Sequence, residues 1–118
     1  MATNRKFKDG KYLQVVCTDP ATPASGDPVR VGQRPGVAQA AEDTADGLTS
    51  VDFGGVYLLS VKGVDGGGNS AVAVGDIIYY VDADTPKLSK KTTGVRFGYA
   101  LEAITSGSTA TIMVAVGY

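Results

Sequence analysis

The chain contains no histidine, no tryptophan and a single cysteine, Cys17, among its 118 residues. Without histidine, it lacks the usual general base at neutral pH and every Ser–His or Cys–His nucleophile pair. A zinc site needs several cysteine or histidine ligands, and Cys17 also has no partner for an internal disulfide, which is usual in a reducing compartment. We therefore predict that the protein is not an enzyme, and we expect no catalytic residue, no metal and no cofactor.

The chain also lacks an excess of charge and a long apolar run. Its 11 basic and 12 acidic residues give a net charge of −1, whereas nucleic-acid binders carry a basic stripe that replaces phosphate counterions. No apolar run approaches the ~18 residues of a membrane span, and the charged N-terminus lacks the apolar core of a signal peptide. We expect neither nucleic acid nor a membrane as a partner.

Glycine and proline are plentiful instead. The 16 glycines and 5 prolines separate short apolar segments, a pattern typical of many strands and turns. Residues 1–10 are polar and basic and predict a flexible N-terminal arm, followed by a single β domain over residues 11–118. The predicted fold class is all-β, a small barrel or sandwich with at most one short helix.

Individual segments support this class. Thr49–Phe53 alternates apolar and polar side chains, as a half-buried strand does, and Val56–Val61 is apolar on both faces, which predicts a central strand. Lys87–Lys91 carries lysines that discourage further pairing and predicts an edge strand. Phe97–Ile104 and Thr109–Val116 predict a hairpin. Ala38–Thr44 suits either a short strand or a turn of helix.

A weak internal repeat is also present. Gly26-Asp27 and Gly75-Asp76 each precede a short strand, and two further matches place Gly36-Val37-Ala38 against Gly98-Tyr99-Ala100 and the segment Asp46–Phe53 against Ser106–Met113. Each half is too small to bury its own apolar face. The pattern predicts two β units that pack against each other, with chance similarity among glycine-rich strands as the alternative.

The six tyrosines are the remaining candidates for a binding surface. Tyr79 and Tyr80 are adjacent in a predicted strand and must point to opposite faces, so at least one is expected near the surface or at a self-association interface. A different possibility is a ligand- or glycan-binding β module that uses Tyr79, Tyr80 and Tyr99. An enzyme that used carboxylates alone would depend on Glu102, and nothing in the sequence favours it.

The ordered set of motifs resembles a known family over nearly the whole chain. In sequence order, these motifs are Met1-Ala2-Thr3-Asn4, Ser25–Val29, Gly36-Val37-Ala38, Val51–Phe53 with Gly55-Val56-Tyr57, Val74–Tyr79, Lys87-Leu88-Ser89, Gly98–Glu102 and the final strand Thr109–Val116. They resemble the capsid decoration, or cement, proteins of tailed bacteriophages and, more distantly, the lambda-type head decoration protein.

This resemblance implies a compact β-tulip-like fold and a structural role without catalysis. It implies attachment to the exterior of the mature capsid, with the major capsid protein as partner and further copies of the chain as neighbours, commonly in trimers. It also implies synthesis in the host cytoplasm and a final location on the virion. The residues expected to contact the capsid are those of the basic arm, Thr3, Asn4, Arg5, Lys6, Phe7 and Lys8, since a disordered arm can become ordered on a partner.

Overall fold

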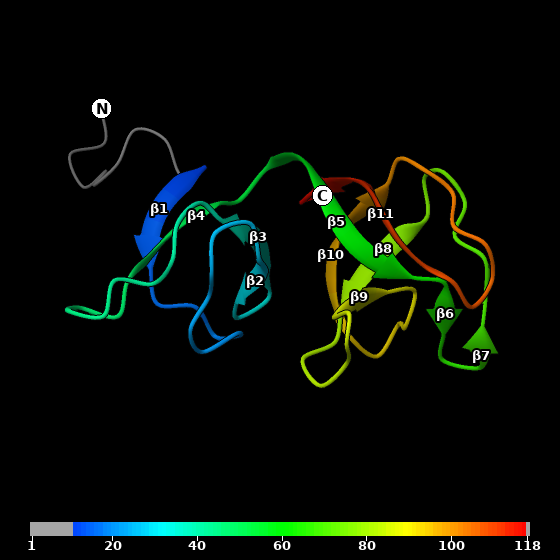
Figure 1. Ribbon diagram of the computed structural model, residues 1–118, viewed down its shortest axis with the longest axis horizontal. Coiled ribbons are helices and arrows are strands. Elements are labelled where there is room, and N and C mark those ends of the chain that lie inside the picture. The colour runs from blue at the N-terminus through cyan, green and yellow to red at the C-terminus, as the bar shows by residue number, and fades with distance from the viewer. Residues whose placement is uncertain (1–10, 118) are drawn as a thin grey trace, which may run out of the picture.

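The computed structural model describes residues 11–117, and every regular element in this range is a strand (Figure 1). The strands are β1 (Tyr12–Val15), β2 (Pro28–Val31), β3 (Arg34–Ala38), β4 (Thr49–Asp52), β5 (Gly55–Lys62), β6 (Val64–Asp65), β7 (Gly68–Asn69), β8 (Ile77–Tyr80), β9 (Leu88–Ser89), β10 (Val95–Ala100) and β11 (Thr109–Val116). The predicted all-β fold class is therefore confirmed. The predicted arm over residues 1–10 lies outside the described range.

The strands form two units that lie side by side (Figure 1). Residues 11–53, the N-terminal unit, form a 4-stranded sheet in the order β1-β4-β3-β2. Residues 55–117, the C-terminal unit, form a closed barrel in the order β10-β11-β5-β9-β8, from which the two-stranded β6-β7 sheet projects. Closure removes the free strand edges of the C-terminal unit, so its outer surface is made of side chains.

Each unit has its own cluster of buried apolar side chains, and one residue connects the two. Cys17, Val29 and Val51 belong to the cluster of the N-terminal unit. Val37 of β3 is fully buried but packs with the core of the barrel, and β3 contacts both β10 and β11. The predicted packing of two small β units against each other is confirmed by this shared contact.

Charged side chains reinforce the joint between the units. The buried hydroxyl of Tyr80 in β8 donates a hydrogen bond to Asp19 at 2.5 Å, and Lys87 lies 2.9 Å from the same carboxylate. Arg30 of β2 binds Asp82 through two nitrogens, at 2.8 and 2.5 Å. A bidentate guanidinium–carboxylate pair restricts geometry in two directions, so it orients one unit against the other.

The internal repeat is visible in the backbone hydrogen bonds. The amide of Gly26 donates to Ala38 at 2.8 Å and the amide of Ala38 to Asp27 at 2.9 Å; the amide of Gly75 donates to Ala100 at 2.7 Å and the amide of Ala100 to Asp76 at 2.9 Å. Gly26 and Gly75 also share a positive φ, of 86° and 90°, which side chains disfavour. Both units therefore use the same glycine turn to start a strand.

The equivalence extends over four strands. The sheet order β1-β4-β3-β2 of the N-terminal unit corresponds to the order β5-β11-β10-β8 around the barrel. The cross-strand partners then set the register: Ala38 faces Val51, and its counterpart Ala100 faces Val114. This register places Thr49–Phe53 opposite Ile112–Val116 in the comparison of the units. The predicted match of Thr49–Phe53 with Thr109–Met113 is therefore wrong by three residues. It aligned Gly47 with Gly107, whereas the connection from Ala100 to Val114 is only one residue longer than that from Ala38 to Val51.

Three other expectations need correction. Lys87–Lys91 is not an edge strand, since β9 lies inside the barrel between β5 and β8. The segment after Ala38 is a loop, which settles the choice that Ala38–Thr44 left open, and β10 ends at Ala100 instead of reaching Ile104. Val56–Val61 pairs with β11 along its whole length but with β9 only at Val61, so the predicted central strand is central at that end alone. It is also buried on one face only, because nothing in the described chain covers the outside of the barrel there.

Close approach of backbones at two equivalent glycines gives a test of this packing. A Cβ on Gly98 would collide with the carbonyl oxygen of Ala115, and one on Gly36 would collide with the side chain of Val51. We predict that Gly98→Ala lowers the free energy of unfolding by about 1–3 kcal/mol, measured by urea denaturation. Gly66→Ala, where a Cβ meets nothing within 4 Å, is the control and should stay within about 0.5 kcal/mol of the parent. Equal stability of the two variants would contradict the described contact.

Candidate functional site

The predicted capsid-contact residues Thr3, Asn4, Arg5, Lys6, Phe7 and Lys8 all lie outside the described residues. The described chain begins at Lys11, which directly precedes β1. The surroundings of Lys11 therefore define the root of the arm, meaning the place where residues 1–10 join the folded body.

A cluster of polar side chains holds the arm root. Asp52 at the end of β4 is 2% exposed, and its carboxylate lies 3.1 Å from the ammonium group of Lys11. The same carboxylate accepts hydrogen bonds from the amide of Gly54 at 3.0 Å and from the hydroxyl of Tyr57 in β5. Gln39 donates to the oxygen of Tyr57 at 3.0 Å. This cluster ties β1, β4 and β5 together at one point.

The cluster also determines the charge state of Asp52. Burial alone would raise its pKa, but the hydrogen bonds from Tyr57, Gly54 and Lys11 together hold the pKa of Asp52 below its ordinary value. Burial and the neighbouring carboxylate raise the pKa of Tyr57. Asp52 is therefore an ionised acceptor and Tyr57 a neutral donor at neutral pH, which is a structural arrangement and not an acid–base pair.

The first strand offers a second feature that a partner can use. Because β1 stands at one end of the order β1-β4-β3-β2, one of its edges faces no strand among the described residues. Unpaired N–H and C=O groups along such an edge can accept an added strand. Residues 1–10 lead directly into this edge strand.

The structure separates the tyrosines that the sequence singled out. Tyr79 is half-buried and Tyr80 is 1% exposed, so the adjacent rings point to opposite faces as predicted. Tyr80 packs at 6.1 Å, centroid to centroid, against Phe97 in the core, which leaves Tyr79 as the member of the pair that a second copy can reach. Tyr99 is half-buried, and its hydroxyl accepts a hydrogen bond from Arg96 at 2.9 Å. These rings do not line a common cleft.

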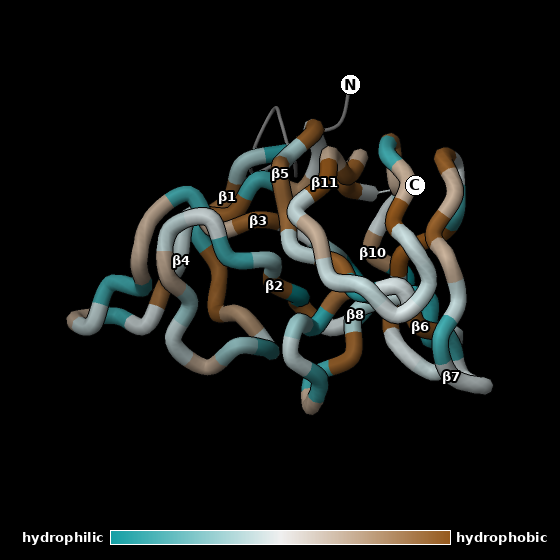
Figure 2. The backbone as a smooth tube through the Cα atoms, turned by 45° about the vertical axis from the view of Figure 1, so that its right-hand side comes forward, coloured by the Kyte–Doolittle hydropathy of each residue, from teal (hydrophilic) through white to brown (hydrophobic). Residues whose placement is uncertain are grey.

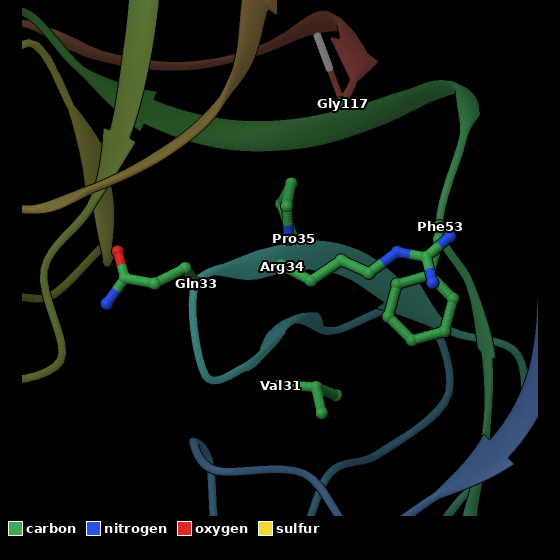
Figure 3. Close-up of a pocket in the computed structure, with 6 residues that line it drawn as sticks. All are labelled: Val31, Gln33, Arg34, Pro35, Phe53 and Gly117. Carbon is green, nitrogen blue, oxygen red and sulfur yellow. The ribbon is translucent and has the colours of Figure 1, made fainter.

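A hollow of about 500 Å³ lies beside the joint between the units (Figure 3). It is lined by Val31, Gln33, Arg34, Pro35, Phe53 and Gly117. The guanidinium of Arg34 stacks at 4.0 Å over the ring of Phe53, an arrangement that stabilises both side chains. No local pattern predicted this hollow, because its residues come from β2, β3, the turn between them and the positions that follow β4 and β11.

Two further searches concern the described part of the chain. Among residues 11–117, no group of three or more histidine, cysteine, aspartate or glutamate side chains is placed to hold a metal ion. No helix in that range has the length and apolar character needed to cross a membrane. The polar clusters described above instead hold the two units and the arm root in place.

The described residues form an all-β body made of an open sheet and a closed barrel, with a polar cluster beside the first strand. A sequence profile of the family described as phage cement protein matches residues 7–116. The chain belongs to this family, and its role is a structural one in binding the phage capsid. Searches of curated proteins and of solved structures found no match.

The lowered pKa of Asp52 predicts how stability depends on pH. A carboxyl group whose pKa is lower in the folded chain stabilises the fold fully above its unfolded pKa of about 3.9 and loses this effect as pH falls through the folded value. Asp76 and Asp82 act in the same direction, since the amide of Ala73 and the guanidinium of Arg30 lower their pKa values. We therefore expect the free energy of unfolding to fall steeply below about pH 4.

Asp52→Asn should remove part of this acid dependence and lower the free energy of unfolding at pH 7 by about 1–3 kcal/mol, because it weakens charge-assisted hydrogen bonds. Denaturation curves between pH 2 and pH 7 measure both effects. Glu42→Gln, in the loop after β3, serves as the control with little change. An Asp52→Asn variant with the parent's full acid dependence would show that the cluster does not hold Asp52 ionised.

Proposed function

We propose that the chain attaches to the outer surface of a mature phage capsid and stabilises the shell, with copies grouped as trimers. The observation that carries this proposal is the family match over residues 7–116, which includes part of the basic arm and almost all of the described body. The arm supplies the capsid contact, through Thr3, Asn4, Arg5, Lys6, Phe7 and Lys8. The β body supplies contacts between neighbouring copies.

The arm root supports this division of roles. The ion pair and hydrogen bonds of Asp52 fix Lys11 against both β4 and β5, so the arm leaves the body from a defined point. An arm that becomes ordered on its partner can add a strand or cross a subunit boundary. Arg5, Lys6 and Lys8 then meet acidic groups of the shell. The edge of β1 that faces no described strand offers backbone groups to the same partner.

Stabilisation of the shell follows from selective binding. A protein that binds only the mature lattice stabilises it by mass action, by an amount that grows with its concentration relative to the dissociation constant. Many copies on one shell add their weak contacts through a high effective concentration. This stabilisation requires no chemical reaction, since each copy acts only by binding neighbouring sites on the shell.

Deletion of residues 1–10 is the direct test of the arm. We predict that the truncated chain keeps its thermal unfolding transition, because the folded body begins at the Lys11–Asp52 cluster, but no longer sediments with purified capsids. A variant with Arg5, Lys6 and Lys8 changed to alanine should bind more weakly and with less dependence on salt. Full occupancy by the truncated chain would show that the body, and not the arm, holds the capsid.

Shell stabilisation has a separate readout. Capsids saturated with the parent chain should release their DNA at a higher temperature than bare capsids, and the difference should increase with the concentration of free chain. Release is followed by the fluorescence of a DNA dye during heating. Bound chain that leaves the release temperature unchanged would support attachment but contradict stabilisation.

A further inference from the structure

The outside of the barrel carries an apolar patch over β11 and the two strands that flank it, β5 and β10. Leu58 of β5 faces Met113 of β11 in the ladder, and the amide of Leu101 bonds to the carbonyl of Met113 at 2.9 Å. These three side chains form a row across three neighbouring chain segments. Leu58 is 67% exposed, Met113 40% and Leu101 37%.

A second row lies beside the first. Val56 faces Ala115, and Ala115 faces Tyr99 on the other side. Val56 is 54% exposed. We name the two rows together, Leu58, Met113, Leu101, Val56, Ala115 and Tyr99, the outer face of the C-terminal unit. Figure 2 shows the apolar segments of β5 and β11 lying next to each other in this region. Contiguous exposed apolar groups of this kind mark interaction sites, whereas single ones do not.

The internal repeat shows that the fold does not need apolar residues here. In the N-terminal unit, the equivalents of these three residues are all polar: Gln14 for Leu58, Ser50 for Met113 and Gln39 for Leu101. Gln14 pairs with Ser50 across the strands, and the amide of Gln39 donates a hydrogen bond to the carbonyl of Ser50 at 2.8 Å, which repeats the contacts of the apolar row. The same row is thus polar in one unit and apolar in the other. Since the equivalent strands of both units pair in the same order, pairing does not require the apolar row, which is therefore available for a contact outside the chain.

The repeat also indicates what covers such a face. The equivalent of Tyr99 in the N-terminal unit is Val37, which packs on the core of the C-terminal unit and is fully buried. This side of one β unit therefore already packs against a β unit within the chain. A second copy of the chain presents β units of the same kind to the outer face.

Charge favours a second copy as well. None of the six outer-face residues is charged, and charge stands only at the border, where Arg96 binds the hydroxyl of Tyr99 at 2.9 Å and Glu102 lies 3.4 Å from the amide of Met113. A charged partner surface would lose hydration over the apolar centre of the face. The arm, by contrast, carries the basic residues suited to an acidic shell. We infer that neighbouring copies of this chain contact each other through the outer face of the C-terminal unit. This inference rests on the proposed function, because it names the surface through which copies on the shell associate.

The small area of the outer face determines whether copies associate free in solution or only on the shell. Stable protein interfaces bury about 800 Å² on each partner, more than six side chains of this kind expose. The free chain should therefore associate only at high concentration. Copies held side by side by their arms have a high effective concentration, so the contact should be complete on the shell.

Photo-crosslinking from Ser60 tests the inference. Ser60 is exposed on the same side of β5, beside Leu58, and pairs with Thr111. A benzophenone amino acid at position 60 of the full chain is activated in two samples, the concentrated free chain and the decorated capsid, and the products are identified by mass spectrometry. We expect an adduct of two copies of the chain, weak in the free sample and strong on the shell.

The repeat supplies the variants. Leu58→Gln, Met113→Ser and Leu101→Gln, introduced together, give the outer face the residues of the N-terminal unit and should reduce the adduct at least about tenfold. The single variant Leu58→Gln, with a smaller reduction, serves if the triple variant unfolds at a lower temperature. The control is Val16→Ser, which replaces an apolar residue of the N-terminal unit, 63% exposed, with serine, the residue found at the equivalent position 60. It should leave the adduct yield unchanged.

Each outcome is informative. An adduct with the capsid protein in place of a second copy, no adduct in either sample, or an adduct that the triple variant does not reduce would overturn the inference. The proposed function is judged separately, by whether the parent chain sediments with capsids at all. If it does not, the free-chain sample still decides whether copies meet through the outer face.

Discussion

Burial of Val37 in the barrel core is the contact on which the rest of the structure depends. Val37 belongs to β3 of the N-terminal unit, yet it packs with side chains of the C-terminal unit. The ion pairs of Asp19 with Lys87 and of Arg30 with Asp82 also join the two units and restrict how one is oriented against the other.

That orientation links the arm root to the outer face. Tyr57 lies in β5 between Val56 and Leu58; its hydroxyl binds Asp52, while its two neighbours point outward from the barrel. One strand therefore carries both the anchor of the arm and the apolar rows. In the proposed function, the first residues hold the shell and the outer face of the body meets neighbouring copies.

Much of the fold could be predicted from local patterns. The glycine turns at Gly26 and Gly75, the alternation in Thr49–Phe53 and the hairpin that ends at Val116 all appear in the structure, because each depends on neighbouring residues. The predicted register of the repeat was wrong by three residues, because it followed the matching glycines Gly47 and Gly107, whereas cross-strand pairing sets the register and leaves no local signal. β9 was misplaced for a similar reason: lysines near Leu88 and Ser89 resemble an edge, but closure of the barrel places these residues between two strands.

The sequence by itself determined the fold class, the duplicated plan and the basic arm, because composition, periodicity and order are local properties of the chain. It also carried the motifs of the phage cement protein family. The tertiary structure alone decided which apolar residues face outward. Val56 and Leu58 are as apolar as Leu59 and Val61, and only the curvature of a closed barrel determines which members of such a strand lie in the core and which lie exposed on the outside.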